Sequence, residues 1–171
     1  MDLSDEDIVS NLNKTGDVKF FEILVDRYKN NIYNFTLRYI SSREDSEDLV
    51  QEIFVKVFFK ISSFDSSKAS FKTWLFTITK NSIYNKLKEK KMVRLTYEIE
   101  DTHKVIDDND DIVQTGLNKL DKKYKLVLIM YYMEGFKYKE ISDILKLPIN
   151  TVKTRIKRGK LLLKNELKEY I

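Results

Sequence analysis

Cysteine is absent from the 171 residues of this sequence. Its absence excludes disulfides, cysteine-ligated zinc and thiol nucleophiles, and it is compatible with a reducing compartment. Proline occurs once and glycine four times, so the chain has few residues that break helices. Charged residues make up 34% and hydrophobic residues 42% of the chain, and Leu, Ile, Lys and Glu recur in runs. This composition predicts an all-α fold.

Long apolar runs are also missing, because no stretch approaches the roughly 18 residues that a membrane span requires. The first residues, MDLSDEDIVSNLNK, are acidic and do not make a secretory signal peptide. We therefore expect a cytoplasmic protein without membrane insertion.

Catalytic patterns are lacking as well. The single histidine, His103, lies in an acidic segment, and the sequence contains no HExxH, Walker or GxGxxG pattern. The acidic residues around it lack the glycine and the spacing of an EF-hand loop. We expect no catalytic residue, no metal site and no cofactor, and hence a protein that is not an enzyme.

Charge is distributed unevenly along the chain. Residues 1–91 carry 15 cationic and 14 anionic side chains, residues 92–112 carry 2 and 7, and residues 113–171 carry 14 and 6. An acidic segment with little apolar periodicity repels itself and behaves as a linker. The sequence therefore predicts two small helical domains, 1–91 and 113–171, joined by a flexible acidic linker, 92–112. The basic zones indicate a polyanionic partner such as nucleic acid, with solvated helix faces as the alternative.

The only proline stands just ahead of the most basic stretch, TVKTRIKRGK. A short amphipathic helix around Ile141 is ended by Pro148, and Asn150 is the predicted N-cap of a second helix. Two helices joined by a tight turn in this way form a helix-turn-helix. Such a turn usually wants a glycine with positive φ, so Lys146 or a neighbour must adopt that conformation at some cost.

The second of these helices is predicted to have two different faces. Its inner face is apolar or small, at helical spacing, and comprises Val152, Ile156, Gly159 and Leu163. Its opposite face carries hydroxyls and long cations, namely Thr151, Lys153, Thr154, Arg155, Lys157 and Arg158. Arg and Lys can bind guanine edges in a major groove, while Thr and Asn can bind base edges or phosphates. The alternative is a cationic amphipathic helix in an ordinary bundle. An upstream helix supplies the expected core residues Leu120, Tyr124, Val127, Leu128 and Tyr131.

The segment SSREDSEDLVQEIFVKVFFKISSF, residues 41–64, begins with Ser42 and Asp45 at capping-box spacing. One side of the predicted helix is apolar. The opposite side mixes acids with apolar residues, namely Asp45, Asp48, Glu52, Val55 and Phe59. Because solvated faces rarely combine acids with a phenylalanine, either the helix is buried nearly all round or this side docks a partner.

Seven lysines lie between residues 68 and 91, where Glu89 is the only acid. The predicted helix in this segment has an apolar face with Phe71, Trp74, Leu75 and Ile78. Another face is polar, aromatic and cationic, with Thr73, Thr77, Asn81, Tyr84 and Lys88. Such a surface suits single-stranded nucleic acid, where stacking on aromatic rings contributes roughly 1–3 kcal/mol per base. The Ser-rich loop before the helix could receive an unstacked base. For Trp74 and Phe76, plain core packing is the alternative.

In order, the segments DSEDLVQEIFVKVF, FDSSKASFKTWLFTITKN and GFKYKEISDILKLPINTVKTRIKRGKLLL resemble a bacterial RNA polymerase sigma factor of the extracytoplasmic-function (ECF) type. This is the minimal two-domain branch of the sigma-70 family. The likeness covers nearly the whole chain, and the order and spacing of the segments are specific. It implies that the first domain docks on core RNA polymerase and recognises and opens the promoter −10 element. It also implies that the second domain binds the duplex −35 element, that the linker threads toward the polymerase active-site and RNA-exit region, and that an anti-sigma factor is a further partner.

The resemblance implies core-polymerase contacts at Asp45, Asp48, Leu49, Gln51, Glu52 and Phe54. For the DNA contacts, the residue patterns and the resemblance together select the positions. The expected −10 contacts are Phe64, Asp65, Ser66, Ser67, Lys68, Lys72, Trp74, Thr77, Lys80, Asn81, Tyr84 and Lys88. The expected −35 contacts are Lys137, Tyr138, Asn150, Thr151, Lys153, Thr154, Arg155, Lys157 and Arg158.

Three positions depart from the pattern of the family. Asn85 stands where the family usually has Asp in the −10 helix, and this concerns the specificity for the −10 element. Ser142 replaces a small Ala, and Lys146 replaces a Gly, and these two concern the geometry of the helix-turn-helix.

Two other functions remain open from the sequence. One is a stand-alone helix-turn-helix regulator that binds duplex DNA without polymerase. The other is a helical adaptor that uses Asp48, Glu52 and Phe59 for docking.

Overall fold

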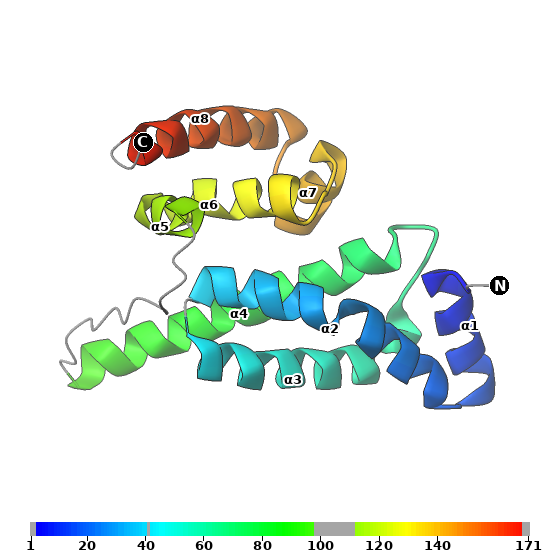
Figure 1. Cartoon of the computed structure of the whole chain (residues 1–171). Helices are drawn as coiled ribbons and strands as arrows, with labels where there is room; N and C mark the ends of the chain where they lie inside the picture. Colours follow the sequence, from blue (N-terminus) through cyan, green and yellow to red (C-terminus); the bar gives the residue numbers. More distant parts are fainter. Residues whose placement is uncertain (1–2, 41, 98–111, 169–171) are drawn as a thin grey trace. The chain divides into compact units, whose positions relative to one another are not determined.

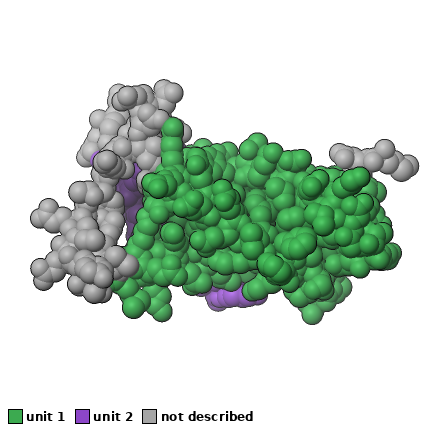
Figure 2. Space-filling model, turned by 90° about the horizontal axis from the view of Figure 1, so that it is seen from below, with its two compact units in different colours: residues 1–103 green, residues 104–171 purple. Residues whose placement is uncertain are grey.

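Helices form every regular element in the described residues, which are 3–40, 42–97 and 112–168 of the computed structural model (Figure 1). The predicted all-α fold is confirmed. The chain divides into two compact units, residues 1–103 and 104–171, which Figure 2 colours separately. None of the helices in this described part is long and apolar enough to cross a membrane.

The first unit is a helical bundle. Its elements are α1 (Asp5–Thr15), α2 (Lys19–Ile40), α3 (Arg43–Lys60), a 3₁₀ turn η1 (Ile61–Ser63) and α4 (Phe71–Tyr97). Helices α2, α3 and α4 pack against one another, and α1 packs against α2 (Figure 1). The buried side chains include Leu24, Ile32, Phe35, Leu49, Ile53, Val57, Leu75 and Phe76. This core determines which faces of α3 and α4 point outward.

Helix α1 is attached to α2 through one carboxylate. Arg27 Nη1 donates to Asp5 Oδ1 at 2.7 Å, and the Tyr28 hydroxyl donates to the other oxygen of Asp5. Burial and the hydrogen bond to Asp5 both raise the pKa of Tyr28. Ser4 caps α1, because its Oγ accepts a hydrogen bond from the Asp7 backbone N–H at 3.1 Å.

The second unit contains α5 (Ile112–Lys119), α6 (Lys122–Leu128), a π-helical turn η2 (Ile129–Met133), α7 (Tyr138–Leu145) and α8 (Ile149–Leu167). Helix α8 packs along α5, α6 and α7. Of the expected core residues, Leu120, Val127 and Leu128 are buried, and Tyr124 and Tyr131 are half-buried. The predicted close approach at Gly159 is confirmed, because a Cβ there would lie 3.2 Å from Leu128 Cδ1.

The helix-turn-helix turn follows the prediction at Lys146. Helix α7 ends at Leu145, and Lys146 adopts the left-handed conformation with φ 55° and ψ 44°. Ser142 compensates for this strain. Its backbone carbonyl accepts from the N–H groups of Lys146 and Leu147, and its hydroxyl donates to the Leu147 carbonyl at 2.5 Å. A serine in place of the family's alanine therefore holds the turn that a glycine would otherwise make easy.

The predicted N-cap at Asn150 is wrong. Helix α8 begins at Ile149, the cap position is Pro148, and no side chain makes a cap hydrogen bond there. The Pro148 carbonyl instead accepts from the N–H groups of Thr151 and Val152 at 2.9 and 3.1 Å. Proline suits this position because its fixed φ is compatible with the entry into a helix and its missing N–H is not needed there. Asn150 lies within the first turn, where its side chain is exposed.

The boundary expected at Lys91 does not end a helix. Helix α4 continues to Tyr97, six residues into the segment predicted as linker, and Ile112 already belongs to α5. The physical reason is that residues 71–97 contain neither Gly nor Pro and are rich in lysine, a good helix former. The rest of the expected linker, 98–111 with His103, lies outside the described residues.

One cation of the second unit is buried. Lys125 is 7% exposed, and its Nζ donates to Asn118 Oδ1 at 2.7 Å. Burial, assisted by the charge of Lys122, lowers the pKa of Lys125 to about 8. Lysine side chains are mostly exposed in proteins, so the burial of Lys125 could not be predicted from the sequence.

We expect Lys146→Gly to stabilise the second unit by about 0.5–1 kcal/mol. It relieves a left-handed conformation that costs an L-residue about 1–2 kcal/mol, and part of this gain is offset by the greater freedom of glycine in the unfolded chain. Native-state hydrogen exchange of the α8 amides measures the change. Asp143→Gly, at an exposed position inside α7, is the matched control and should destabilise by about 0.3 kcal/mol, the difference in helix propensity between Asp and Gly. Equal destabilisation by both variants would mean that Lys146 is not strained.

Candidate nucleic-acid interface

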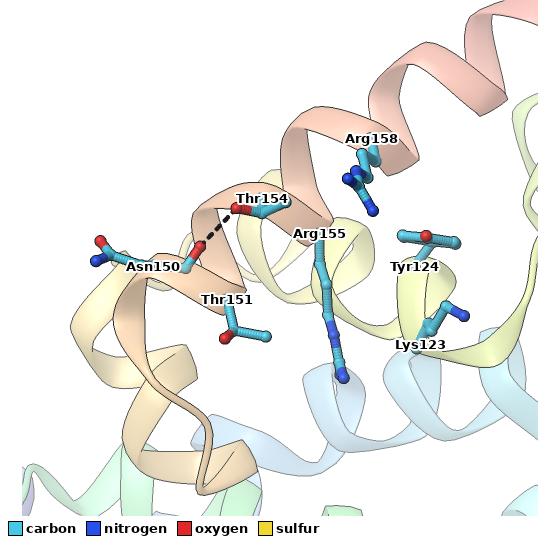
Figure 3. Close-up of a pocket in the computed structure, with 7 residues that line it drawn as sticks. All are labelled: Lys123, Tyr124, Asn150, Thr151, Thr154, Arg155 and Arg158. Carbon is cyan, nitrogen blue, oxygen red and sulfur yellow. Dashed lines mark hydrogen bonds between the residues drawn. The ribbon is translucent and has the colours of Figure 1, made fainter.

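The outward side of α8 carries most of the expected −35 contacts. We call it the recognition face, and it comprises Asn150, Thr151, Lys153, Thr154, Arg155, Lys157 and Arg158. Thr151 and Arg155 are half-buried and the others are exposed, whereas Val152, Ile156 and Gly159 on the other side are buried. The Thr154 hydroxyl donates to the Asn150 backbone carbonyl at 2.8 Å (Figure 3). Thr154 and Arg158 are thus available to a partner rather than enclosed in a bundle.

A hollow lies between the recognition face and the start of α6 (Figure 3). Arg155 and Arg158 line it from α8, and Lys123 and Tyr124 line it from α6. Lys123 Nζ lies 3.1 Å from Asp121 Oδ2 and 5.1 Å from the centroid of the Tyr124 ring. The backbone N–H of Lys123 and then its ammonium lower the pKa of Asp121, which is the N-cap of α6. The arrangement places cations from two helices around one polar hollow.

The start of α7 joins the recognition face through aromatic contacts. The rings of Tyr138 and Tyr131 stack with centroids 5.0 Å apart and an interplanar angle of 11°. Lys153 Nζ lies 5.9 Å from the centroid of Tyr138, within the range of a cation–π interaction. Lys137, directly before α7, is exposed. The structure therefore brings Tyr138 of the first helix together with Lys153 of the second, as the expected −35 set requires.

A cluster of aromatic rings lies beneath the Ser-rich loop of the first unit. The centroid of Phe64 lies 5.6 Å from Phe71 and 5.5 Å from Trp74, and Phe71 and Trp74 are 5.8 Å apart. Phe71 is buried, but Phe64 and Trp74 are half-buried. The expectation of plain core packing is therefore correct for Phe76, which is fully buried, and only partly correct for Trp74.

The loop above these rings is ordered by Asp65. Its Oδ1 accepts from the Ser67 N–H at 3.0 Å and from the Ser67 hydroxyl at 2.6 Å, and its Oδ2 lies 3.1 Å from Lys68 Nζ. The hydrogen bonds from Ser67, followed by the one from Lys68, lower the pKa of Asp65 to about 2. Ser66, Ser67 and Lys68 are exposed. The loop thus presents hydroxyls and a cation on a preformed turn.

Helix α4 continues this surface along its length. Lys72, Thr77 and Lys80 are half-buried, and Asn81, Tyr84 and Lys88 are exposed. Lys80 Nζ lies 5.9 Å from the centroid of the Tyr84 ring. Thr73, expected on the same polar face, is buried at 4% exposure, and Ser70 Oγ accepts from its N–H at 3.2 Å. Thr73 therefore belongs to the start of the helix and not to the surface.

The acidic and apolar side of α3 is exposed. Asp48, Gln51 and Glu52 lie on the surface, as do Val55 and Phe59, which are 55% and 77% exposed. We call these five residues the docking strip. The alternative of a helix buried nearly all round is wrong, because only the opposite side of α3 reaches the core.

Two expected polymerase contacts lie beneath this surface. Leu49 is 1% and Phe54 is 9% exposed, because both project from the side of α3 that packs on the rest of the bundle. They support the docking strip from inside the domain. A third, Asp45, accepts a hydrogen bond from Lys90 Nζ of α4.

Comparison with known proteins assigns both units. The family description "Sigma-70 region 2" matches residues 24–92, and "Sigma-70, region 4" matches residues 110–163. The ECF RNA polymerase sigma factor SigW of Bacillus subtilis is 31% identical over 175 aligned residues, which cover 91% of this chain and 93% of SigW. The chain belongs to the sigma-70 family. The ECF RNA polymerase sigma-E factor of Haemophilus influenzae is also 31% identical, over 96% of each chain.

Two solved structures share this fold. The sigma factor RpoE of Bartonella quintana, solved with the anti-sigma factor NepR, has a TM-score of 0.76 and 24% identity over 88% of this chain and 98% of that one. CnrH, solved with the cytosolic domain of CnrY, has a TM-score of 0.71 and 21% identity over 96% and 95%. The resemblance found in the sequence is therefore confirmed, and nothing in these comparisons supports a stand-alone regulator.

In the unit that matches region 4, two residues outside the expected −35 set lie beside it. Lys123 had no assigned role, and Tyr124 was expected in the core, yet both line the hollow beside Arg155 and Arg158. In the sequence, the adjacent lysines at 122 and 123 are the feature that could have indicated a cationic contact here. Their position opposite α8 depends on how α6 and α8 pack, which the pattern of one helix does not contain.

In region 2, we expect the Asp65 turn to be lost in acid. The folded carboxylate has a pKa of about 2 against an ordinary value of 3.8, so its contribution to stability is complete above about pH 4 and is lost as the pH falls to about 2. Carbon NMR of the Asp65 carboxyl group measures the midpoint. Ser67→Ala should raise that midpoint more than Lys68→Met, and Ser66→Ala is the matched control. An unchanged midpoint in Ser67→Ala would contradict this account of the loop.

Proposed function

We propose that this chain is a promoter-specificity subunit of the ECF type, which binds core RNA polymerase and directs initiation by recognising −35 and −10 promoter elements. The observation that carries the proposal is the presence of two cationic surfaces of different chemistry on separate units. One is a helix-turn-helix face suited to duplex DNA, and the other combines aromatic rings with lysines and suits a melted strand. The chain has no catalysis of its own, because the polymerase supplies the chemistry. Its place is the cytoplasm, where polymerase and promoter DNA are found.

The −35 element is read by α8 in the major groove. Arg155 and Arg158 can each bind guanine through two hydrogen bonds, which contributes roughly 1–3 kcal/mol of discrimination per good pair. The shorter polar side chains Asn150, Thr151 and Thr154 lie toward the start of the helix, where base edges are approached in this motif. Lys137, Lys153, Lys157 and Lys123 supply phosphate contacts, which set the register of the domain on the duplex.

The −10 element is captured at the loop and along α4. An extruded base would stack on the half-buried rings of Phe64 and Trp74, and the loop polar groups Asp65, Ser66, Ser67 and Lys68 would surround its edges. Unstacking the base costs about a few kcal/mol, and the pocket contacts offset this cost. Lys72, Lys80 and Lys88 follow the strand backbone, and Thr77, Asn81 and Tyr84 meet further bases. Asn85, which is exposed on the same helix, is neutral where the family has Asp and should alter the preferred −10 sequence.

Core polymerase is the proposed partner of the docking strip. The strip pairs the carboxylates of Asp48 and Glu52 with exposed Val55 and Phe59, so a matching surface needs cations beside an apolar patch. Phe59 extends the apolar end, because its ring meets Phe58 with centroids 5.8 Å apart, and Phe58 meets Phe21 at 5.0 Å. The acidic linker is proposed to thread toward the polymerase active site and RNA exit, and an anti-sigma factor is a further proposed partner.

We expect Arg158→Ala and Asp48→Ala to have opposite effects. Arg158→Ala should weaken binding to a −35 duplex roughly 5- to 150-fold, the equivalent of about 1–3 kcal/mol, and leave polymerase binding intact. Asp48→Ala should weaken polymerase binding and leave −35 recognition intact. Pull-down with core enzyme measures polymerase binding. Titration of a −35 duplex, taken from a promoter that the wild type selects in run-off transcription on a genomic fragment library, measures −35 recognition.

Lys164→Ala on α8 and Glu47→Ala on α3 are the matched controls, because both residues are exposed and lie outside the proposed contacts. Equal losses in both assays for Arg158→Ala and Asp48→Ala would argue against the division of labour. Tight promoter binding by the free wild-type chain, without affinity for core enzyme, would instead favour a stand-alone regulator.

We expect Lys123→Ala to change the salt dependence of DNA binding but not its sequence preference. The plot of log K against log salt has a negative slope, and each phosphate contact that is lost makes it less steep by about 0.9. Titrations of a −35 duplex at several salt concentrations measure this slope, with Lys164→Ala as the control that keeps it. A changed base preference with an unchanged slope would place Lys123 at a base edge.

A further inference from the structure

The basic half of α4 is held to the domain by few apolar contacts. Up to Ile83 the helix is fixed by fully buried side chains, including Phe71, Leu75 and Phe76. From residue 84 to residue 92 no described side chain is buried. This stretch contains Lys86, Lys88, Lys90 and Lys91, of which Lys88 is among the contacts proposed for the −10 element. Leu87 is half-buried and the Tyr84 ring lies 6.3 Å from that of Tyr39, so apolar packing of this stretch is weak and a polar contact to α3 can add to it.

Asp45 at the start of α3 supplies that attachment. Its carboxylate accepts a hydrogen bond from Lys90 Nζ, and the side chains of the pair are only 24% and 37% exposed. Lys86, one turn earlier on α4, also attracts it. Although partial burial opposes ionisation, the hydrogen bonds from Lys90 and Ser42 outweigh it and lower the pKa of Asp45. The carboxylate is therefore charged and directed at α4 in the free protein.

The neighbouring acids of α3 differ in this respect. Asp48 and Glu52 are exposed in the docking strip, and Glu52 lies 3.6 Å from Lys56 of the same helix. A partner that used Asp45 would instead have to break an ion pair between two helices, with Lys90 of α4. We propose that Asp45 is a positioning residue for promoter opening, which holds the basic half of α4 against α3, and that it is not a contact with core polymerase. The inference rests on the proposed function of α4 at the −10 element.

Loss of this ion pair should change where the lysines of α4 lie relative to the DNA, and not how many of them there are. A helix end that loses its attachment opens locally at low cost, because few buried contacts resist it. The lysines would remain on the chain, but they would no longer be held in line with Tyr84 and the aromatic loop. Recognition of the melted strand should suffer while docking through Asp48 and Glu52 does not.

Charge reversal tests this role. Asp45→Lys and Lys90→Asp each place like charges in contact, and each should reduce opening of the −10 region roughly 2- to 5-fold. The double variant restores an ion pair of reversed polarity and should recover most of the loss. Permanganate reactivity of unpaired thymines measures opening, in complexes of the full chain with core polymerase on a promoter fragment selected by run-off transcription. Core-polymerase affinity, measured in parallel, should stay within about twofold of the wild type in all three variants.

Asp48→Lys and Glu47→Lys are the controls on the same helix. Asp48→Lys should lose polymerase binding, and Glu47→Lys, at an exposed position outside the docking strip, should behave as the wild type. If a reversed variant fails to fold, Asp45→Asn removes the charge alone and should show a smaller loss of opening. The proposal is overturned if Asp45→Lys loses polymerase affinity as Asp48→Lys does and Lys90→Asp fails to restore it.

Hydrogen exchange separates this proposal from the proposed function itself. In the free chain, the amides of residues 84–92 should exchange faster in both single variants and return to the wild-type rate in the double variant. Unchanged exchange in the single variants would overturn the attachment, whatever the activity. A wild-type chain that neither binds core polymerase nor opens a promoter would instead contradict the proposed function, and exchange would still decide whether Asp45 holds α4.

Discussion

Burial of one apolar stripe on each long helix decides which side chains this protein offers to its partners. An α-helix repeats every 3.6 residues, so placing Val152, Ile156 and Gly159 against α6 turns the cations of α8 outward. The same constraint acts in the first unit, where burial of Leu49, Ile53 and Val57 exposes the docking strip of α3. On α3 and on α8, the exposed functional surface is the side of the helix opposite its buried residues.

The two cationic surfaces divide the recognition of one promoter by the state of its DNA. Region 4 presents arginines and short polar side chains on a rigid helix, which suits base edges in an intact groove. Region 2 presents half-buried rings under a loop and lysines along a helix, which suit bases that have left the stack. Because the chain divides into two compact units, each surface is built by its own core. Acids accompany some of these cations, as Asp65 does Lys68 and Asp121 does Lys123, at 3.1 Å in both cases.

Departures from the usual pattern of the family are compensated locally. Lys146 takes a left-handed conformation that a glycine would adopt at little cost, and Ser142 contributes three hydrogen bonds around the same turn. Two of these hydrogen bonds use the backbone carbonyl, which any residue at 142 supplies, and the hydroxyl adds the third, which an alanine could not make. Asp45 shows the converse situation, because it matches the pattern of the family but is engaged by Lys90 inside the domain.

Much of the architecture follows from local pattern. Apolar spacing and the scarcity of Gly and Pro predict the helices, Pro148 predicts the end of α7, and the left-handed Lys146 follows from the tightness of the turn. The errors arose where local rules compete. Asn150 is a good capping residue, but Pro148 occupies the cap, and the lysine-rich end of α4 continues as helix where an acidic linker was expected to begin.

The sequence by itself determined the helical class, the two cationic zones and the family, because these depend on periodicity, composition and the order of motifs. Only the tertiary structure decided which functional side chains are exposed and which are already engaged. Leu49 and Phe54 lie in the core, Lys123 joins the arginines of α8, Lys125 is buried, and Asp45 pairs with Lys90. The physical reason is that a contact between two helices depends on the register and rotation of both, which packing of the whole core sets and neither segment encodes alone.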